Sequence, residues 1–221
     1  IVHHVALKPV FYGSMAVWLG GRPSQVNAVA GLGWLFISRS TAARFMSPFI
    51  RWILSRFLSA PRCQVIVQNP EDEALLKKAG VPESHLRMVR GAGVDTTVFS
   101  PSPEPLEPIC VVMATRILWD KGVGEFVDTV RILRSKKIDF KATLVGQIED
   151  ENPTSIDRKV IKKWVGEGLV EYLGEQDNIE KIWAISHIAV LPSYHEGLPK
   201  TLIEAASCSK PIVATKIDGC M

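Results

Sequence analysis

The first seventy residues contain neither aspartate nor glutamate, although the whole chain has 23 acidic residues. The basic residues of this stretch are Lys8, Arg22, Arg39, Arg44, Arg51, Arg56 and Arg62. A region of one charge sign favours a polyanionic partner, either membrane lipid or nucleic acid. No helix-turn-helix and no sheet with stacking aromatic residues is visible in the sequence, so we expect a membrane surface as the partner and no nucleic acid.

Long hydrophobic runs and dense cysteine patterns are also missing. No apolar run of about twenty residues could span a bilayer, and the start lacks the layout of a signal peptide. The four cysteines, Cys63, Cys110, Cys208 and Cys220, show no paired metal-ligand spacing, which favours reduced thiols in a cytoplasmic protein without zinc or disulfides. Because the chain begins without methionine and ends just after a strand and loop, we expect an internal fragment of a longer protein.

Strands and helices alternate along the whole chain. Short apolar segments predict strands at 1–6, 25–30, 64–68, 109–114, 140–145, 170–173, 188–191 and 212–214. Apolar residues at helical spacing predict helices at 8–19, 41–58, 71–79, 156–165 and 179–185, and others that begin near 123 and 199. This order predicts an α/β protein with parallel sheets.

A proline-rich stretch separates two domains. Pro101, Pro103, Pro105 and Pro108 give the composition of a linker, which we place at 101–107. We therefore expect one Rossmann-like domain over 1–100 and a second over 108–221.

The predicted helix at 41–58 combines aromatic and basic residues. Its aromatic residues are Phe45, Phe49, Trp52 and Phe57, and its basic residues are Arg44, Arg51 and Arg56. Such a helix can lie in the membrane interface, with its apolar face in the lipid and its arginines among anionic head groups. The alternative is that the apolar face packs on the sheet. We favour interfacial docking, because packing alone does not require the absence of acidic residues.

Two carboxylates flank a junction between a loop and a helix near the end of the chain. Glu196 lies in the loop after the strand at 188–191, and Glu204 lies about one turn inside the next helix. Gly197 allows a ligand to approach the backbone, and the first amides of the helix are unpaired. This arrangement suits a sugar nucleotide, because carboxylates accept hydrogen bonds from sugar hydroxyls. Two solvated glutamates would give the same pattern.

Two basic residues follow the first strand of the second domain. Arg116 lies at the carboxyl end of the strand at 109–114, and Lys121 lies at the start of the next helix. In open α/β sheets, ligands bind in the crevice at the carboxyl ends of the strands. Arginine can bind phosphate oxygens with two parallel hydrogen bonds, and lysine acts as a point charge. The pair therefore suits a diphosphate.

These motifs, in this order, resemble those of the family-4 retaining glycosyltransferases, which have the GT-B fold. In that family two glutamates bracket seven residues, as Glu196 and Glu204 do here. The stretch 115–122 (TRILWDKG) resembles the family pattern GRLxxEKG, with Thr115 in place of Gly and Asp120 in place of Glu. The stretch 92–99 resembles the NGVDxxxF entry to the second domain, with Ala in place of Asn at its first position. The resemblance implies two Rossmann-like domains of the GT-B fold, both incomplete in this chain.

The run VHHVALKPVFYGSMAVWLGG, followed by NAVAGLG, is similar to bacterial enzymes that extend lipid-linked oligosaccharides. The implied activity is retaining transfer of a sugar from a UDP- or GDP-sugar to a membrane-associated saccharide acceptor, expected to be linked to polyprenyl diphosphate, in cell-surface polysaccharide synthesis. The implied location is cytoplasmic, at the inner face of the plasma membrane. No cofactor is expected. Because Arg116 and Lys121 can do what a divalent metal does in other transferases, we also expect no metal.

The resemblance also implies residue roles. Arg116 and Lys121 would stabilise the leaving diphosphate, Glu196 would contact the transferred sugar, and Glu204 would hold the ribose. The other donor-binding candidates are Gly146, Gly197, Leu198, Pro199 and Lys200. The acceptor-side candidates are His4, Lys8 and Gly31. A histidine common in the family is replaced at the aligned strand end by 30–33 (AGLG), and His4 could instead have a structural role.

Two other functions remain open at this point. A GT-B sugar-nucleotide epimerase or phosphorylase would keep the fold but change the chemistry. A non-catalytic nucleotide-sugar-binding module would keep the binding site alone.

Overall fold

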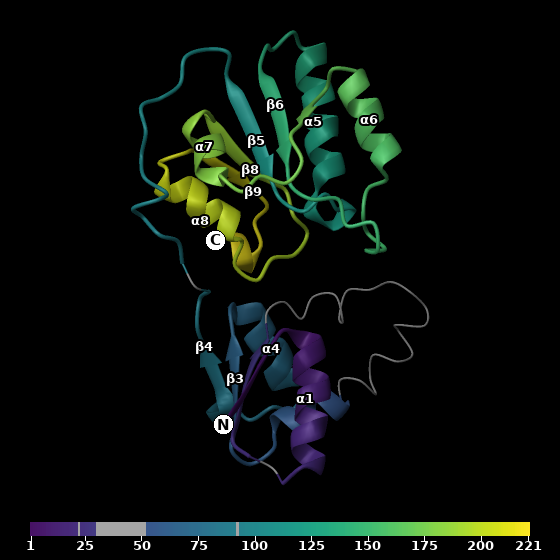
Figure 1. The fold of residues 1–221 in the computed structure, drawn as a ribbon, viewed down its shortest axis with the longest axis vertical. Coiled ribbons are helices and arrows are strands. Elements are labelled where there is room, and N and C mark those ends of the chain that lie inside the picture. Colours follow the sequence, from purple (N-terminus) through teal and green to yellow (C-terminus); the bar gives the residue numbers. More distant parts are fainter. Residues whose placement is uncertain (22, 30–51, 92) are drawn as a thin grey trace. The chain divides into compact units, whose positions relative to one another are not determined.

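The computed structural model describes residues 1–21, 23–29, 52–91 and 93–221. Contacts within the chain divide it into two compact units. Unit 1 comprises residues 1–92 with 196–198 and 221, and unit 2 comprises residues 93–195 and 199–220. Figure 1 shows unit 1 in purple to blue and most of unit 2 in teal to yellow. No helix among the described residues is long and apolar enough to cross a membrane.

Unit 1 is a parallel four-stranded sheet with the strand order β1-β2-β3-β4. Its strands are β1 (Val2–Val5), β2 (Gln25–Val29), β3 (Cys63–Val67) and β4 (Leu86–Met88). Its helices are α1 (Leu7–Leu19) and α4 (Pro70–Lys78), and residues 52–58 are also helical. The rest of the predicted membrane helix at 41–58, and Gly31, lie outside the described residues.

The core of unit 1 lies on one face of this sheet. Alternate residues of β2 and β3 are buried, as expected for a strand with one covered face. Three helical residues pack against that face: Val10 of α1, Leu58 of the helical segment 52–58, and Leu76 of α4. Asn69 caps α4, because its side-chain oxygen accepts a hydrogen bond from the backbone N–H of Asp72 at 2.7 Å.

Unit 2 is a parallel five-stranded sheet with the strand order β7-β6-β5-β8-β9. Its strands are β5 (Cys110–Ala114), β6 (Lys141–Val145), β7 (Glu171–Tyr172), β8 (Ile188–Leu191) and β9 (Ile212–Ala214). Its helices are α5 (Val123–Ser135), α6 (Arg158–Gly166), α7 (Ile179–Ala184) and α8 (Lys200–Ser207). The strand order reverses at β5, so the crevice beside β5 and β8 is the expected ligand site of such a sheet.

Helices lie on both faces of the second sheet (Figure 1). One apolar cluster joins Met113 of β5 to Phe126 of α5 and Trp164 of α6. Another joins Val112 of β5 to Trp183 of α7. Neighbouring residues of β5 thus point into opposite layers, which explains why this strand is apolar throughout.

The predicted α/β class and the alternation of strands and helices are confirmed. The strand β4 and the 3₁₀ helix Glu83–His85 that precedes it were not predicted. The division between the units falls at Gly93, ahead of the proline-rich stretch at 101–107. The physical reason lies in Phe99, which is buried in the core of unit 2 together with Val112. The residues just before the prolines therefore already belong to the second unit.

Candidate nucleotide-sugar site

The site is built at the carboxyl edge of the sheet in unit 2, where the ends of β5, β6 and β8 lie side by side. The β5 chain continues in register beyond the strand, because the backbone N–H of Thr115 donates to Val145 O at 2.9 Å and that of Ile117 to Gln147 O at 2.9 Å. Arg116 therefore lies between two anchored residues. Ile117 is fully buried, so its neighbour Arg116 is held at the sheet edge with its side chain half exposed.

Two glycines allow these loops to come close together. A Cβ atom on Gly146, at the end of β6, would lie 1.8 Å from Thr115 O, and a Cβ on Gly122 would lie 2.2 Å from Pro192 O. Both glycines have positive φ angles, of 141° and 77°. The loop after β5 is thus packed directly against the loop after β6 on one side and the loop after β8 on the other.

Lys121 lies at this junction and is buried, with 9% of its surface exposed. Its ammonium donates to His195 O at 3.4 Å, in the loop after β8. That loop is tied to the same turn by Tyr194 N, which donates to Asp120 O at 3.0 Å, and by Ser193, whose hydroxyl donates to Asp120 O at 3.4 Å.

Arg116 contacts a carboxylate from the loop after β6. Its Nη1 atom lies 3.4 Å from both carboxylate oxygens of Glu149. Glu149 also accepts a hydrogen bond from Asn152 at 2.8 Å. This hydrogen bond, and then the charge of Arg116, lower the pKa of Glu149, so the carboxylate is ionised at neutral pH.

The same loop reaches the segment next to Lys121. Asn152 accepts hydrogen bonds from the backbone N–H and the hydroxyl of Thr154, and the Thr154 hydroxyl lies 3.1 Å from a carboxylate oxygen of Asp120. A continuous series of polar contacts thus runs from Arg116 through Glu149 to Asp120. Sequence reasoning missed this series, because its members come from two loops and show no local motif.

Glu204 lies in the second turn of α8, the helix that follows β8. The residue is buried, with 6% of its surface exposed, and its Oε1 atom lies 3.5 Å from the ammonium of Lys200 one turn earlier. Pro199 occupies the N-cap in an extended conformation, and no side chain caps the helix. A buried carboxylate can accept hydrogen bonds from the ribose hydroxyls of a nucleotide. The backbone N–H groups at the start of the helix, which no side chain caps, can bind an anion.

The loop residues 196–198 belong to unit 1 in the division of the chain. The site described here is therefore built from Arg116, Lys121, Gly146, Lys200 and Glu204, with the loops that hold them. The predicted roles of Glu196, Gly197 and Leu198 stay predictions.

The acceptor-side candidates lie in unit 1. His4 points from β1 towards α1: its Nδ1 atom lies 2.8 Å from Asn27 Oδ1, and its ring occupies the space that a Cβ atom on Gly13 of α1 would need. These contacts are what a structural role for His4 would require. Lys8 is exposed in the first turn of α1, and Gly31 lies outside the described residues.

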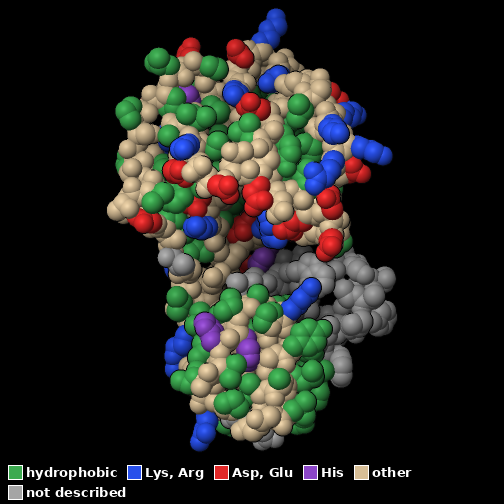
Figure 2. Space-filling view, in the orientation of Figure 1, with side chains coloured by type: hydrophobic (Ala, Val, Ile, Leu, Met, Phe, Trp, Pro, Cys, Tyr) green, Lys and Arg blue, Asp and Glu red, His purple; other side chains and the backbone are tan. Residues whose placement is uncertain are grey.

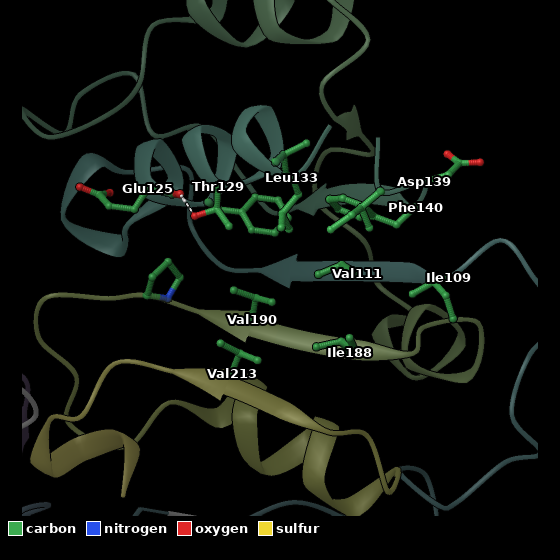
Figure 3. Close-up of a pocket in the computed structure, with 14 residues that line it drawn as sticks. Ile109, Val111, Glu125, Thr129, Leu133, Asp139, Phe140, Ile188, Val190 and Val213 are labelled. Carbon is green, nitrogen blue, oxygen red and sulfur yellow. Dashed lines mark hydrogen bonds between the residues drawn. The ribbon is translucent and has the colours of Figure 1, made fainter. Parts of the chain in front are cut away.

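A separate apolar pocket of about 420 Å³ lies along one face of the sheet in unit 2. Val111, Ile188, Val190 and Val213 point into it from three strands, and Leu133 points into it from α5 (Figure 3). The pocket runs along the strands from Pro192, just after β8, to Ile109, just before β5. Arg116 and Lys121 do not line it.

Residues 108–221, about half of the chain, match the family Glycosyl transferases group 1. The match covers the whole polar edge described above. The chain belongs to this family. Its enzymes are glycosyltransferases, so the predicted enzyme class is confirmed.

Curated relatives of this family match beyond the second unit. The chain is 28% identical over 237 residues to an N,N'-diacetylbacillosaminyl-diphospho-undecaprenol α-1,3-N-acetylgalactosaminyltransferase of Campylobacter jejuni, covering 100% of the chain and 60% of the relative. It is 28% identical to the capsular polysaccharide glycosyltransferase CapM of Staphylococcus aureus, covering 99% of the chain and 59% of the relative. The chain thus spans about 60% of the length of these relatives.

Solved structures confirm the GT-B fold. The complex of Anabaena Alr3699/HepE with UDP-glucose superposes with a TM-score of 0.76 at 20% identity, over 97% of this chain and 59% of that protein. A sucrose-phosphate synthase from Thermosynechococcus elongatus gives a TM-score of 0.75 at 20% identity, over 99% and 56%. The resemblance inferred from the paired glutamates and from Arg116 and Lys121 is therefore confirmed at the level of family and fold.

Proposed function

We propose that the protein transfers a sugar from a UDP- or GDP-sugar to a saccharide linked to polyprenyl diphosphate, with retention of configuration and without a metal ion. The observation that carries this proposal is the position of Arg116 and Lys121. Both lie on the loop after β5, and neighbouring strand ends hold that loop from both sides.

The chemistry follows from where charge develops. As the bond from the anomeric carbon to the diphosphate breaks, negative charge grows on the leaving phosphate oxygens. Arg116 and Lys121 would stabilise that charge, and fixed cations need no reorganisation during the reaction. The acceptor hydroxyl would attack from the same face, and the leaving phosphate oxygen would take its proton. No protein nucleophile is needed for this route to retention.

Donor recognition is proposed to involve α8 and its preceding loop. Glu204 would accept hydrogen bonds from the ribose hydroxyls, and the amides at the start of α8 would lie near the phosphate and sugar. Glu196 would contact the transferred sugar, and the backbone amides of Gly197 and Leu198 would lie near the sugar and phosphate.

The acceptor class is supported by the activities of two relatives. The Campylobacter jejuni relative and an Escherichia coli relative, 23% identical over 99% of this chain, both act on saccharides linked to undecaprenol diphosphate. Such an acceptor lies at a membrane, so we propose peripheral attachment to the inner face of the plasma membrane. The first seventy residues contain basic residues but no aspartate or glutamate, which supports this location.

A panel of nucleotide sugars tests the proposal. The purified protein is incubated with each donor and a short prenyl-diphosphate-linked saccharide, with and without EDTA, and products are identified by mass spectrometry and NMR. We expect one donor to give an acceptor one sugar longer with the donor's anomeric configuration, at a rate that EDTA does not change.

Two outcomes would contradict this function. Conversion of the nucleotide sugar without an acceptor would indicate an epimerase. Binding of a nucleotide sugar with no product would indicate a binding module.

A further inference from the structure

The connection that leads into the second sheet is fastened to unit 2. We call residues 99–108 the strap; Figure 1 draws it in teal, between β4 and β5. Three side-chain hydrogen bonds join it to the ends of α8 and α7 and to the residue before β8: Ser207 Oγ to Phe99 O, Ser102 Oγ to Ala184 O (3.5 Å), and His187 Nε2 to Pro105 O (3.1 Å). The proline-rich stretch is therefore attached to unit 2 at several points along its length.

His187 joins the strap to the first residue of β5. The residue is buried, with 7% of its surface exposed. Its Nδ1 atom lies 3.0 Å from the backbone nitrogen of Cys110, and its Nε2 atom lies 3.1 Å from Pro105 O. The backbone N–H of His187 also donates to Cys110 O at 2.8 Å, so the start of β5 fixes the residue from which the ring extends. Each ring nitrogen thus has one backbone partner.

These two partners determine which ring nitrogen carries the proton. A backbone N–H can only donate, so Nδ1 must accept the bond from Cys110 with its lone pair. A carbonyl oxygen can only accept, so Nε2 must carry the proton and donate to Pro105 O. A second proton would go to Nδ1, where it would face the N–H of Cys110 across 3.0 Å. The two bonds together therefore require the neutral imidazole.

The surroundings of the ring offer no partner for a charged imidazole. The titratable residues on the neighbouring elements are Glu104 and Glu107 of the strap, Cys110 of β5, Asp139 and Lys141 at the start of β6, Glu180 and Lys181 of α7, and Lys210 before β9. Both strap glutamates are exposed, and in the described part of the chain no carboxylate pairs with His187. Figure 2 shows acidic and basic side chains interspersed on the drawn face of unit 2, without a field of one sign. A second proton would thus bury an unpaired charge, which is costly.

We propose that His187 is an acid-sensitive latch that fastens the strap at Pro105 to the start of β5. When the ring is protonated, it loses its bond to Cys110, leaves its buried position and releases the strap. An exposed histidine takes up its second proton at about pH 6.5, so the strap is held at neutral pH and released in mild acid. The released form binds one proton more than the held form, so the held form loses stability as the pH falls. The latch needs neither sugar donor nor acceptor and is independent of the proposed function.

NMR of the protein with nitrogen-labelled histidine tests the state of the ring. At neutral pH, Nδ1 of His187 should give the signal of an unprotonated nitrogen and Nε2 that of a protonated one. His85 is the matched control within the chain. Its Nδ1 atom lies 3.1 Å from a carbonyl oxygen, that of Leu58, and should therefore carry the proton. A protonated Nδ1 on His187 at neutral pH would overturn the proposal.

Amide hydrogen exchange tests the release. Exchange of the Cys110 N–H is followed by NMR at neutral and mildly acidic pH and corrected for the intrinsic pH dependence of exchange. We expect the protection of this amide to fall by about tenfold in mild acid, because a buried hydrogen bond is lost. The amide of Leu144, within β6, reports global opening and should keep its protection. Unchanged protection of Cys110, or an equal loss at both amides, would contradict a local latch.

His187→Asn separates titration from hydrogen bonding. The asparagine amide oxygen can accept a bond from the Cys110 N–H, but the side chain takes up no proton in this pH range. Protection of the Cys110 amide should then be the same at both pH values. His85→Asn is the control and should respond to acid as the wild type does, because a protonated His85 keeps its bond to Leu58 O. An acid response of His187→Asn as large as that of the wild type would assign the effect to another group. If His187→Asn does not fold, the two measurements on the unchanged protein decide.

Discussion

Two groups of polar residues, one in each unit, have different surroundings. In unit 1 one group lies between the sheet and α1, and its members satisfy one another: His4 contacts Asn27, Asn27 donates to Cys63 Sγ at 3.3 Å, and Ser14 of α1 donates to Gln25 at 3.1 Å. In unit 2, Lys121 and Glu204 are buried at the edge of the sheet, beside loops.

This difference shows that burial of a polar residue does not by itself indicate function. A polar group inside a sheet must be satisfied by its neighbours, so its role is to stabilise one packing arrangement. A charged group buried at the carboxyl edge of parallel strands lies beside the crevice where ligands bind in such sheets. The predictions below test this distinction, from the largest expected effect to the smallest.

Arg116→Ala should have the largest effect. Loss of a cation that stabilises developing charge typically lowers kcat by about 10²- to 10³-fold. We expect this loss without a change in melting temperature, because Arg116 is half exposed and its ion pair with Glu149 is long. Arg131→Ala is the matched control, because Arg131 of α5 is also half exposed and ion-paired but lies away from the strand ends. If Arg116→Ala turned over substrate as fast as the wild type, the charged residues at the edge of unit 2 would not serve the reaction.

Gly146→Ala should disturb the edge of unit 2 through the backbone. The added Cβ atom would overlap Thr115 O, and alanine disfavours the φ angle of 141°. Strain and overpacking together should lower the free energy of unfolding by about 3 kcal/mol, measured by urea denaturation. Gly166→Ala is the control, since beyond the neighbouring backbone of its own helix no atom lies within 4 Å of its added Cβ. Equal stability of the two variants would contradict the close packing of the β5 and β6 loops.

Asn27→Ala should affect stability and spare donor binding. The substitution removes the partner of His4 and of Cys63 in a fully buried position, so the free energy of unfolding should fall by about 1–2 kcal/mol. Calorimetry with UDP or GDP should give an unchanged affinity. A selective loss of nucleotide affinity at unchanged stability would show that this buried polar network serves the site after all.

Glu149→Gln should have the smallest effect. An exposed ion pair is worth about 0.2–1 kcal/mol, so freeing Arg116 from the carboxylate should tighten nucleotide diphosphate binding by up to about fivefold at low salt. Because the pKa of Glu149 is lowered, the gain should persist over neutral pH and disappear only as the pH falls through that lowered value, where the wild type also loses the charge. Glu171→Gln, which breaks the exposed pair with Lys141, is the control. Weaker binding by Glu149→Gln would mean that Glu149 positions Arg116.

Local sequence was sufficient to predict most elements of the fold. The apolar strand at β5, the capped helix α4 and the segment from β8 to β9 were predicted with boundaries close to those observed, because their signals lie within a few neighbouring residues. The short strand β4 was not predicted. Its pairing with β3 supplies the stabilisation that three residues of sequence do not show.

The sequence alone determined the α/β class, the family resemblance and the identity of the paired basic and acidic residues, since each depends on residue types at short spacing. Only the tertiary structure decided that Gly146 and Gly122 bring three strand ends together, that Glu149 contacts Arg116, and that His4 points at Asn27. Those contacts join residues between 23 and 70 positions apart, and spacing along the chain carries no information about them. The sequence identified Arg116, Lys121 and Glu204 as separate candidates, and the fold places them along the same edge of the sheet in unit 2.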